Sequence, residues 1–146
     1  MQLSKRTQYG LRAMVCLADA YQRGYLQTKE LANREKLPTK FLESILSTLT
    51  RGKFLISKIG ATGGYRLAKA PQDILVLEIV ARLEGKKLVE EEEIEPAADE
   101  RPGEIAIRAI HSQLSTAVHD VLANITLAQL AEKVSQTLRS SQMYYI

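Results

Sequence analysis

Cysteine is nearly absent from this sequence, because Cys16 is the only one among 146 residues. A single thiol permits neither an internal disulfide nor a multi-cysteine metal cluster within one chain. Long hydrophobic runs are also missing, and no stretch approaches the ~18 apolar residues of a membrane span. Residues 1–6 lead directly into an amphipathic pattern without the apolar core of a signal peptide. These absences exclude a disulfide scaffold and a membrane-spanning protein, and we expect a cytoplasmic one.

The remaining composition is that of a globular domain with unevenly distributed charge. Hydrophobic residues make up 45% and charged residues 25% of the chain, which excludes collagen-like and disordered proteins. The length corresponds to about one domain. Residues 1–70 carry 13 Lys and Arg against 4 Asp and Glu, whereas residues 71–146 carry 7 against 13. The basic first half favours a polyanionic partner, although charges that only solvate the surface would give the same pattern.

Apolar residues at helical spacing predict two helices at the start of the chain. The first covers residues 5–23, with Ser4 as its N-cap and Gly24 at its end. A short second helix covers residues 28–35, with Thr28 as its cap.

A third helix follows residues 36–39, which interrupt the pattern because the residue before Pro38 avoids helical geometry. We expect it over residues 40–51, with Thr39 as its cap. Its inward stripe is predicted to be Phe41, Leu42, Ile45, Leu46 and Leu49.

The period then changes, and residues 54–67 predict a β-hairpin whose tip is the glycine-rich stretch 60–64. This stretch is not a phosphate-binding loop, because no Lys-Ser/Thr pair follows it and it lies between strands. A fourth helix over residues 74–83, a charged loop over 86–103, and helices over 104–124 and 127–138 complete the expected elements.

Three helices followed by a hairpin are the order of a winged helix-turn-helix, in which the third helix enters the major groove of DNA. We expect Lys40, Glu43 and Ser44 to read bases, with Glu43 alternatively rejecting wrong bases by repulsion. Other expected DNA contacts are Lys5, Arg6, Tyr9, Thr28, Thr39, Ser47, Arg51, Lys58 and Thr62, of which Lys5, Arg6, Lys58 and Thr62 contact the backbone. Small three-helix domains that bind proteins remain an alternative.

Several motifs resemble one family, the Rrf-type winged-helix regulators that include IscR, NsrR and CymR. They are residues 1–14, Lys40-Phe-Leu-Glu43, Gly63-Gly-Tyr-Arg-Leu67, Leu83-Glu-Gly85 and 120–127. The resemblance extends to about Leu130 and implies a dimeric transcription regulator.

The long helix over residues 104–125 is where the resemblance places the dimer contact. Its apolar face has no obvious cover in so small a chain, which independently indicates a partner surface, although a helix folded back on its own domain would also cover it. The expected dimer residues are Ile107, Ile110, Leu114, Val118 and Val121.

Many relatives hold an iron–sulfur cluster on three cysteines in the loop before this helix, but residues 86–103 contain none. We interpret Cys16 as a small buried hydrophobic residue. His111 and His119 are eight residues apart, too far for a metal pair on one helix turn, and Glu90–Glu93 is interpreted as a solvated loop and not as a cation site. No cofactor or metal is expected.

The acidic loop and the terminal Met143-Tyr-Tyr-Ile146 resemble the cluster-free, CymR-like branch, which regulates cysteine metabolism together with cysteine synthase. Tyr145 and Ile146 would offer a carboxylate and an apolar plug to that enzyme, unless the tail docks on its own dimer. The sequence offers no nucleophile–base pair for catalysis.

The expected fold is thus mainly α with a small β-hairpin (α+β). It comprises a winged helix-turn-helix domain over residues 1–70 and a fourth helix with acidic loop over 71–103. A dimerisation helix over 104–127 and a C-terminal helix and tail over 128–146 follow. The expected function is a dimeric, sequence-specific DNA-binding repressor of cysteine or sulfur metabolism genes that recognises an inverted repeat.

Overall fold

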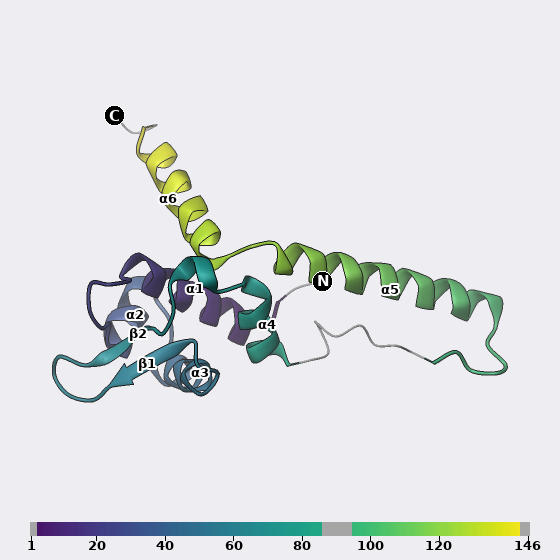
Figure 1. Cartoon of the computed structure of the whole chain (residues 1–146), viewed down its shortest axis with the longest axis horizontal. Coiled ribbons are helices and arrows are strands. Elements are labelled where there is room, and N and C mark those ends of the chain that lie inside the picture. Colours follow the sequence, from purple (N-terminus) through teal and green to yellow (C-terminus); the bar gives the residue numbers. More distant parts are fainter. Residues whose placement is uncertain (1–2, 86–94, 144–146) are drawn as a thin grey trace.

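A group of helices and one hairpin form the body of the protein, and two helices extend from it, in the computed structural model of Figure 1. The structure describes residues 3–85 and 95–143. Its elements are α1 (Lys5–Asp19), α2 (Thr28–Glu35), α3 (Thr39–Arg51), β1 (Leu55–Lys58), β2 (Gly64–Leu67), the 3-10 helix η1 (Pro71–Asp73), α4 (Val76–Glu84), α5 (Pro102–Ala123) and α6 (Leu127–Met143). Figure 1 shows α5 as a long arm leaving the body, with α6 projecting in another direction. The mainly α fold with one small hairpin is confirmed.

The core lies where α1, α3 and α4 pack together. Met14, Ile45, Leu49 and Ile79 are fully buried there, and burying each such side chain contributes about 1.5–3 kcal/mol to folding. Leu127, at the start of α6, is also fully buried. The buried residues therefore anchor α6 to the body, whereas α5 contains no buried residue.

Helix α1 begins at Lys5 with Ser4 as its N-cap, as predicted. The Ser4 hydroxyl accepts a hydrogen bond from the backbone N–H of Thr7 at 3.2 Å, which satisfies one of the free donors of the first turn. The predicted end of α1 is wrong, however, because the helix stops at Asp19 and not at Arg23. Gln22 and Gly24 have φ values of +68° and +103°, so the chain turns through left-handed geometry before Gly24 is reached.

The predicted caps Thr28 and Thr39 are both wrong. Each threonine is the first residue of its helix, and the capping positions are Gln27 and Pro38, which make no capping hydrogen bond through their side chains. Gln27 stays extended because its neighbour Leu26 pairs with Tyr65 of β2. Pro38 has the φ of −62° that its ring imposes, with an extended ψ of 122°, so α3 begins directly after it.

The predicted hairpin is confirmed within residues 54–67. Strands β1 and β2 are antiparallel, with Leu55 opposite Leu67 and Lys58 opposite Gly64. The side chains of Leu55 and Leu67 are buried, and Ile56 is exposed, so one face of the hairpin packs on the helices and the other faces solvent. Following the usual name for this element, we call residues 55–67 the wing.

The second half differs from expectation mainly at the ends of its helices. α4 begins at Val76 and not at Ile74, because the extended chain there pairs with residues 125–127, with Leu127 N–H donating to the Ile74 carbonyl at 2.8 Å. α5 begins at Pro102, whose fixed φ suits a first helical turn, and α6 continues beyond Leu138 to Met143. Residues 86–94, which include Glu90–Glu93, lie outside the described residues. In residues 3–85 and 95–143 no helix has both the length and the apolarity that crossing a membrane requires.

Candidate nucleic-acid interface

The solvent-facing side of α3 carries a row of polar side chains. Lys40, Ser44, Ser47 and Arg51 are all exposed and follow one another at spacings of three or four residues, which places them on one side of a helix. The opposite side is formed by Leu42, Ile45, Leu46 and Leu49, none of which is more than 1% exposed. The apolar side therefore fixes α3 against the body, and the row of Lys40, Ser44, Ser47 and Arg51 is free to meet a ligand. We call it the α3 row.

Glu43 and Thr39 are also exposed and lie beside the α3 row. Glu43 makes no ion pair among the described residues. The row is consequently basic at both ends, at Lys40 and Arg51, with one carboxylate near its first turn.

Arg6 of α1 forms hydrogen bonds with two side chains of α3. Its guanidinium donates to the Ser44 hydroxyl at 3.3 Å and to the Thr48 hydroxyl at 2.6 Å. Arg82 of α4 reaches the same turn, with its Nε donating to the Thr48 carbonyl at 3.2 Å. Two arginines from different helices thus brace one turn of α3. Arg82 was missed by sequence reasoning, because nothing in its helical pattern shows which neighbour it meets.

Phe41 was expected to face inward, and this is wrong: its side chain is 38% exposed. Its ring meets Tyr9 of α1 edge-on, with centroids 5.6 Å apart and an interplanar angle of 85°, an arrangement that aromatic pairs favour. Arg12 lies over the Tyr9 ring at 5.6 Å and pairs with Glu35. Tyr9 therefore supports the first turn of α3 from the side.

The start of α1 is held by α4. The Ser4 backbone N–H donates to Glu84 Oε1 at 2.6 Å. Desolvation raises the pKa of Glu84, but the hydrogen bonds from Ser4 and Thr7 outweigh it, so this pKa lies below its ordinary value. This contact fixes the position of the first turn of α1, which carries exposed Lys5 and half-buried Arg6.

The wing contributes exposed Lys58 and Thr62. Lys58 is not isolated, since its Nζ lies 5.7 Å from the centroid of the Tyr25 ring, and Arg66 lies 4.9 Å from the same centroid. Tyr25 and Arg66 were missed by sequence reasoning, because Tyr25 precedes α2 and gives no periodic signal. Thr28 is half-buried at the start of α2.

The predicted DNA contacts thus lie on the body, on α1, α2, α3 and the wing, whereas the predicted dimer residues lie on the separate arm α5. Ile107, Ile110, Leu114 and Val121 are 48–60% exposed, and Val118 is half-buried. Most of the apolar face predicted from the sequence is therefore left exposed by residues 3–85 and 95–143.

This architecture agrees with comparisons to known proteins. The profile of the Rrf2 family, described as an iron-dependent transcriptional regulator, matches residues 3–133. The chain belongs to the Rrf2 family of transcriptional regulators. The resemblance drawn from its motifs is thereby confirmed, and its relatives are helix-turn-helix regulators rather than enzymes.

Two relatives and two solved structures illustrate the similarity. The chain is 32% identical to the transcriptional regulator CymR of Bacillus subtilis over 146 residues, which is 100% of both proteins. It is 30% identical to the protein rrf2 of Nitratidesulfovibrio vulgaris over 135 residues, 92% of this chain and 90% of that protein. The structure of B. subtilis CymR, described as the global cysteine regulator, superposes with a TM-score of 0.77 at 32% identity, covering 91% of this chain and 98% of that one. The structure of T. potens IscR gives a TM-score of 0.78 at 28% identity, covering 94% and 90%.

The residues of this Rrf2 protein do not fit an iron–sulfur cluster. Thiolates hold such clusters, and the sequence has only Cys16. The Cys16 side chain is half-buried against the core, and its Sγ lies 3.4 Å from Glu35 Oε1. Burial and the Glu35 carboxylate raise the pKa of the thiol to about 11. Within the described ranges no three His, Cys, Asp or Glu side chains gather as a metal site.

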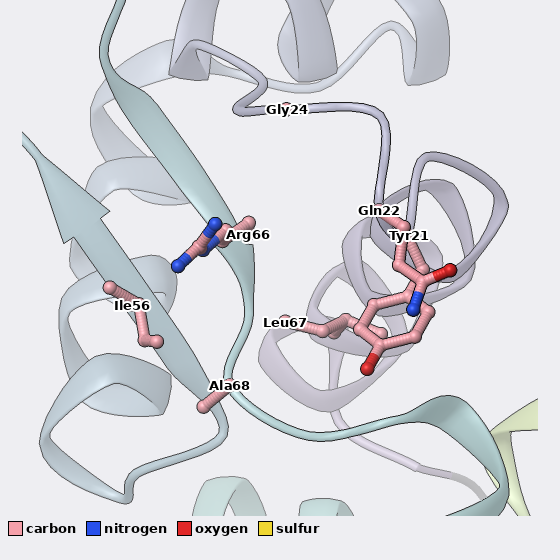
Figure 2. Close-up of a pocket in the computed structure, with 7 residues that line it drawn as sticks. All are labelled: Tyr21, Gln22, Gly24, Ile56, Arg66, Leu67 and Ala68. Carbon is pink, nitrogen blue, oxygen red and sulfur yellow. The ribbon is translucent and has the colours of Figure 1, made fainter.

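A pocket of about 280 Å³ lies between the end of α1 and the wing (Figure 2). Figure 2 shows the Arg66 side chain directed toward Ile56, with Tyr21 and Gln22 on the opposite side. Because its polar groups do not converge on one point, we assign no ligand to this pocket.

Proposed function

We propose that this Rrf2 protein is a homodimeric, sequence-specific repressor whose α3 reads the major groove of an inverted-repeat operator. The observation that carries the proposal is the α3 row. Four polar side chains are exposed along a helix whose opposite side is almost completely buried. A helix presented in this way fits the major groove, where side chains of these types can hydrogen-bond to base edges.

The side chains around α3 suggest a division of roles. We assign base reading to Lys40, Glu43 and Ser44, and sequence-independent backbone contacts to Lys5, Lys58 and Thr62. Glu43 has a second role open to it, because a carboxylate near phosphates repels them and can exclude wrong bases. If so, Glu43→Ala broadens sequence preference without weakening binding, whereas Lys40→Ala weakens it.

The dimer is proposed to form through α5. This helix has 22 residues and none of them is buried, and its isoleucines, Leu114 and Val121 present an exposed apolar surface. Two copies related by a two-fold axis would present two α3 helices, and the operator would then share that symmetry.

We further propose that the regulator works without an iron–sulfur cluster and controls sulfur metabolism genes. The single cysteine, protonated at neutral pH, supports the first part. The similarity to CymR, which is described as a global cysteine regulator, supports the second. Selection of bound genomic fragments tests it. Enrichment of fragments upstream of cysteine and sulfur metabolism genes is expected, and enrichment of unrelated fragments would contradict it.

The proposed partner that regulates this activity is cysteine synthase, bound through the C-terminal tail. Tyr145 and Ile146 lie outside the described residues, and the last described residue, Met143, is 76% exposed at the end of α6. In Figure 1 this end of α6 points away from α3, so a partner held there would leave α3 accessible.

Deleting residues 145–146 tests the partner. We expect loss of binding to purified cysteine synthase, unchanged thermal stability and unchanged DNA affinity of the regulator alone. A tail docked on its own dimer would instead give lower thermal stability and no change in enzyme binding. Genomic selection with and without the enzyme then shows whether the complex alters which fragments are bound.

A further inference from the structure

One aromatic ring contacts two cationic side chains of the wing. The Tyr25 ring has Lys58 Nζ at 5.7 Å and Arg66 Cζ at 4.9 Å from its centroid. In the hairpin register Arg66 is opposite Ile56, and Lys58 is opposite Gly64. Since side chains alternate along a strand, Ile56, Lys58 and Arg66 share one face of the wing. That face is the solvent-facing one, because Ile56 is 39% exposed and both cations are exposed.

Tyr25 is fixed relative to the wing by its neighbours in sequence. Leu26 is buried and forms two backbone hydrogen bonds with Tyr65 of β2, at 2.9 and 2.8 Å. The Gln27 side chain donates to the Ala61 carbonyl in the wing turn at 2.8 Å. The segment 25–27 is therefore attached to β2 and to the turn of the wing, so the backbone of Tyr25 is held beside the strands that carry the two cations.

The charges explain why a ring is needed at this place. Neither Lys58 nor Arg66 forms an ion pair with a carboxylate of the described residues, so their mutual repulsion is not offset in that way. The face of an aromatic ring carries negative potential and attracts both cations. The contact also restricts the two long side chains before an anion binds. They therefore lose less conformational entropy on binding than unrestrained side chains would.

We propose that Tyr25 is a positioning residue that holds Lys58 and Arg66 as a clamp for the phosphodiester backbone of DNA. This inference rests on the proposed DNA-binding role of the wing and adds Tyr25 and Arg66 to it. The clamp contacts phosphates and not bases, so it acts equally on operator and unrelated DNA. Tyr25 itself acts through the two cations and does not touch DNA.

The test uses full-length protein and a fluorescent duplex of random sequence, with binding measured by anisotropy across a series of salt concentrations. Tyr25→Leu removes the ring and keeps an apolar side chain, and Tyr25→Phe is the matched control that keeps the ring. We expect Tyr25→Leu to weaken binding about three- to tenfold and Tyr25→Phe to bind within twofold of the parent. Lys58→Met and Arg66→Met should each reduce the salt slope by about one, whereas Lys133→Met on α6 should not change it.

Coupling between the residues separates positioning from general stability. In the Lys58→Met/Arg66→Met background, Tyr25→Leu should cause no further loss of affinity, because the cations that it positions are gone. An equal loss in both backgrounds would overturn the proposal and assign Tyr25 a purely structural role. Unchanged salt slopes for both methionine variants would also overturn it. Loss of sequence preference after replacement of Lys40 would still support α3 as the reading helix in that case, so the two proposals fail separately.

Discussion

The guanidinium of Arg6 donates a hydrogen bond to the hydroxyl of Ser44, and so joins the first helix to the α3 row. A second bond from the same guanidinium reaches Thr48, one turn further along α3. Arg6 was expected to contact the DNA backbone, and Ser44 to contact bases. Their hydrogen bond means that the position of Ser44 depends on Arg6, so the two residues should act as one unit.

Replacing Arg6 and Ser44 together should therefore be non-additive. Arg6→Met releases the Ser44 hydroxyl, so it should relax the sequence preference and also weaken the affinity for DNA. We expect a coupling free energy of about 0.5–3 kcal/mol between Arg6→Met and Ser44→Ala in operator binding. Lys5→Met and Ser47→Ala are the matched control pair, since no hydrogen bond joins Lys5 to Ser47. Purely additive effects for Arg6 and Ser44 would show that the bond has no role on DNA.

The wing should not tolerate a side chain at Gly64. This residue has a φ of +133°, and a Cβ there would lie 2.3 Å from the Leu26 carbonyl oxygen. Gly64→Ala is expected to destabilise the fold by about 2–5 kcal/mol, since it combines backbone strain with overpacking. Denaturant unfolding measures this effect. Gly103→Ala is the control, because nothing lies within 4 Å of its Cβ, and it should be neutral or stabilising by up to about 1 kcal/mol. Equal stability of Gly64→Ala and the parent would contradict the close contact between Leu26 and the wing.

Cys16 should react slowly with alkylating reagents at neutral pH. Burial and the Glu35 carboxylate raise its pKa from 9.0 to about 11, which lowers the thiolate fraction about 100-fold relative to a thiol of ordinary pKa. The rate of alkylation by iodoacetamide should rise until about pH 11. Glu35→Gln should lower this pKa and speed the reaction, whereas Glu30→Gln on the same helix should not.

The same pKa has a consequence for stability. The folded state holds the thiol proton more tightly than the unfolded state, so the contribution is complete below about pH 9 and is lost as the pH rises toward 11. In the alkylation test, a fast reaction of Cys16 with iodoacetamide whose rate has its pH midpoint near 9 would show instead that the thiol is not shielded by burial and Glu35.

Leu114→Glu should prevent dimerisation. This substitution places a carboxylate in the exposed apolar face of α5, where Leu114 is 48% exposed. We expect sedimentation to show a monomer and operator affinity to fall together with dimerisation. Gln113→Glu adds the same charge to the neighbouring position and should leave the dimer intact. A stable Leu114→Glu monomer that binds a half-site with the full affinity of the parent would contradict a role for dimerisation.

Much of the fold followed from the sequence because its signals are local. The inward residues Leu42, Ile45, Leu46 and Leu49 have helical spacing, and the glycines of residues 60–64 mark the turn of the hairpin. The predicted limits of α2 are those of the structure. Ser4 was identified as a cap because capping needs only a hydroxyl three residues before the N–H that it accepts.

The errors arose where distant contacts override local preference. Ile74 pairs with Leu127, which keeps the chain extended at Ile74, where helix was expected. Leu26 pairs with Tyr65, which keeps Gln27 extended as the capping residue in place of Thr28. Phe41 is apolar, but its ring packs edge-on against Tyr9 at the surface and not in the core. The contacts of Arg6, Arg82 and Arg66 depend on how helices cross, which periodicity does not reveal.

The most direct test of the account compares binding sites selected from a random duplex pool by the parent protein and by the triple variant Lys40→Ala/Glu43→Ala/Ser44→Ala. The parent should enrich an inverted repeat whose half-sites lie about one helical turn, or a multiple of it, apart. The triple variant should still retard DNA at low salt, because its backbone contacts remain, but it should lose the preferred bases in each half-site. Enrichment of the same sequence by both proteins would contradict the claim that α3 reads the operator.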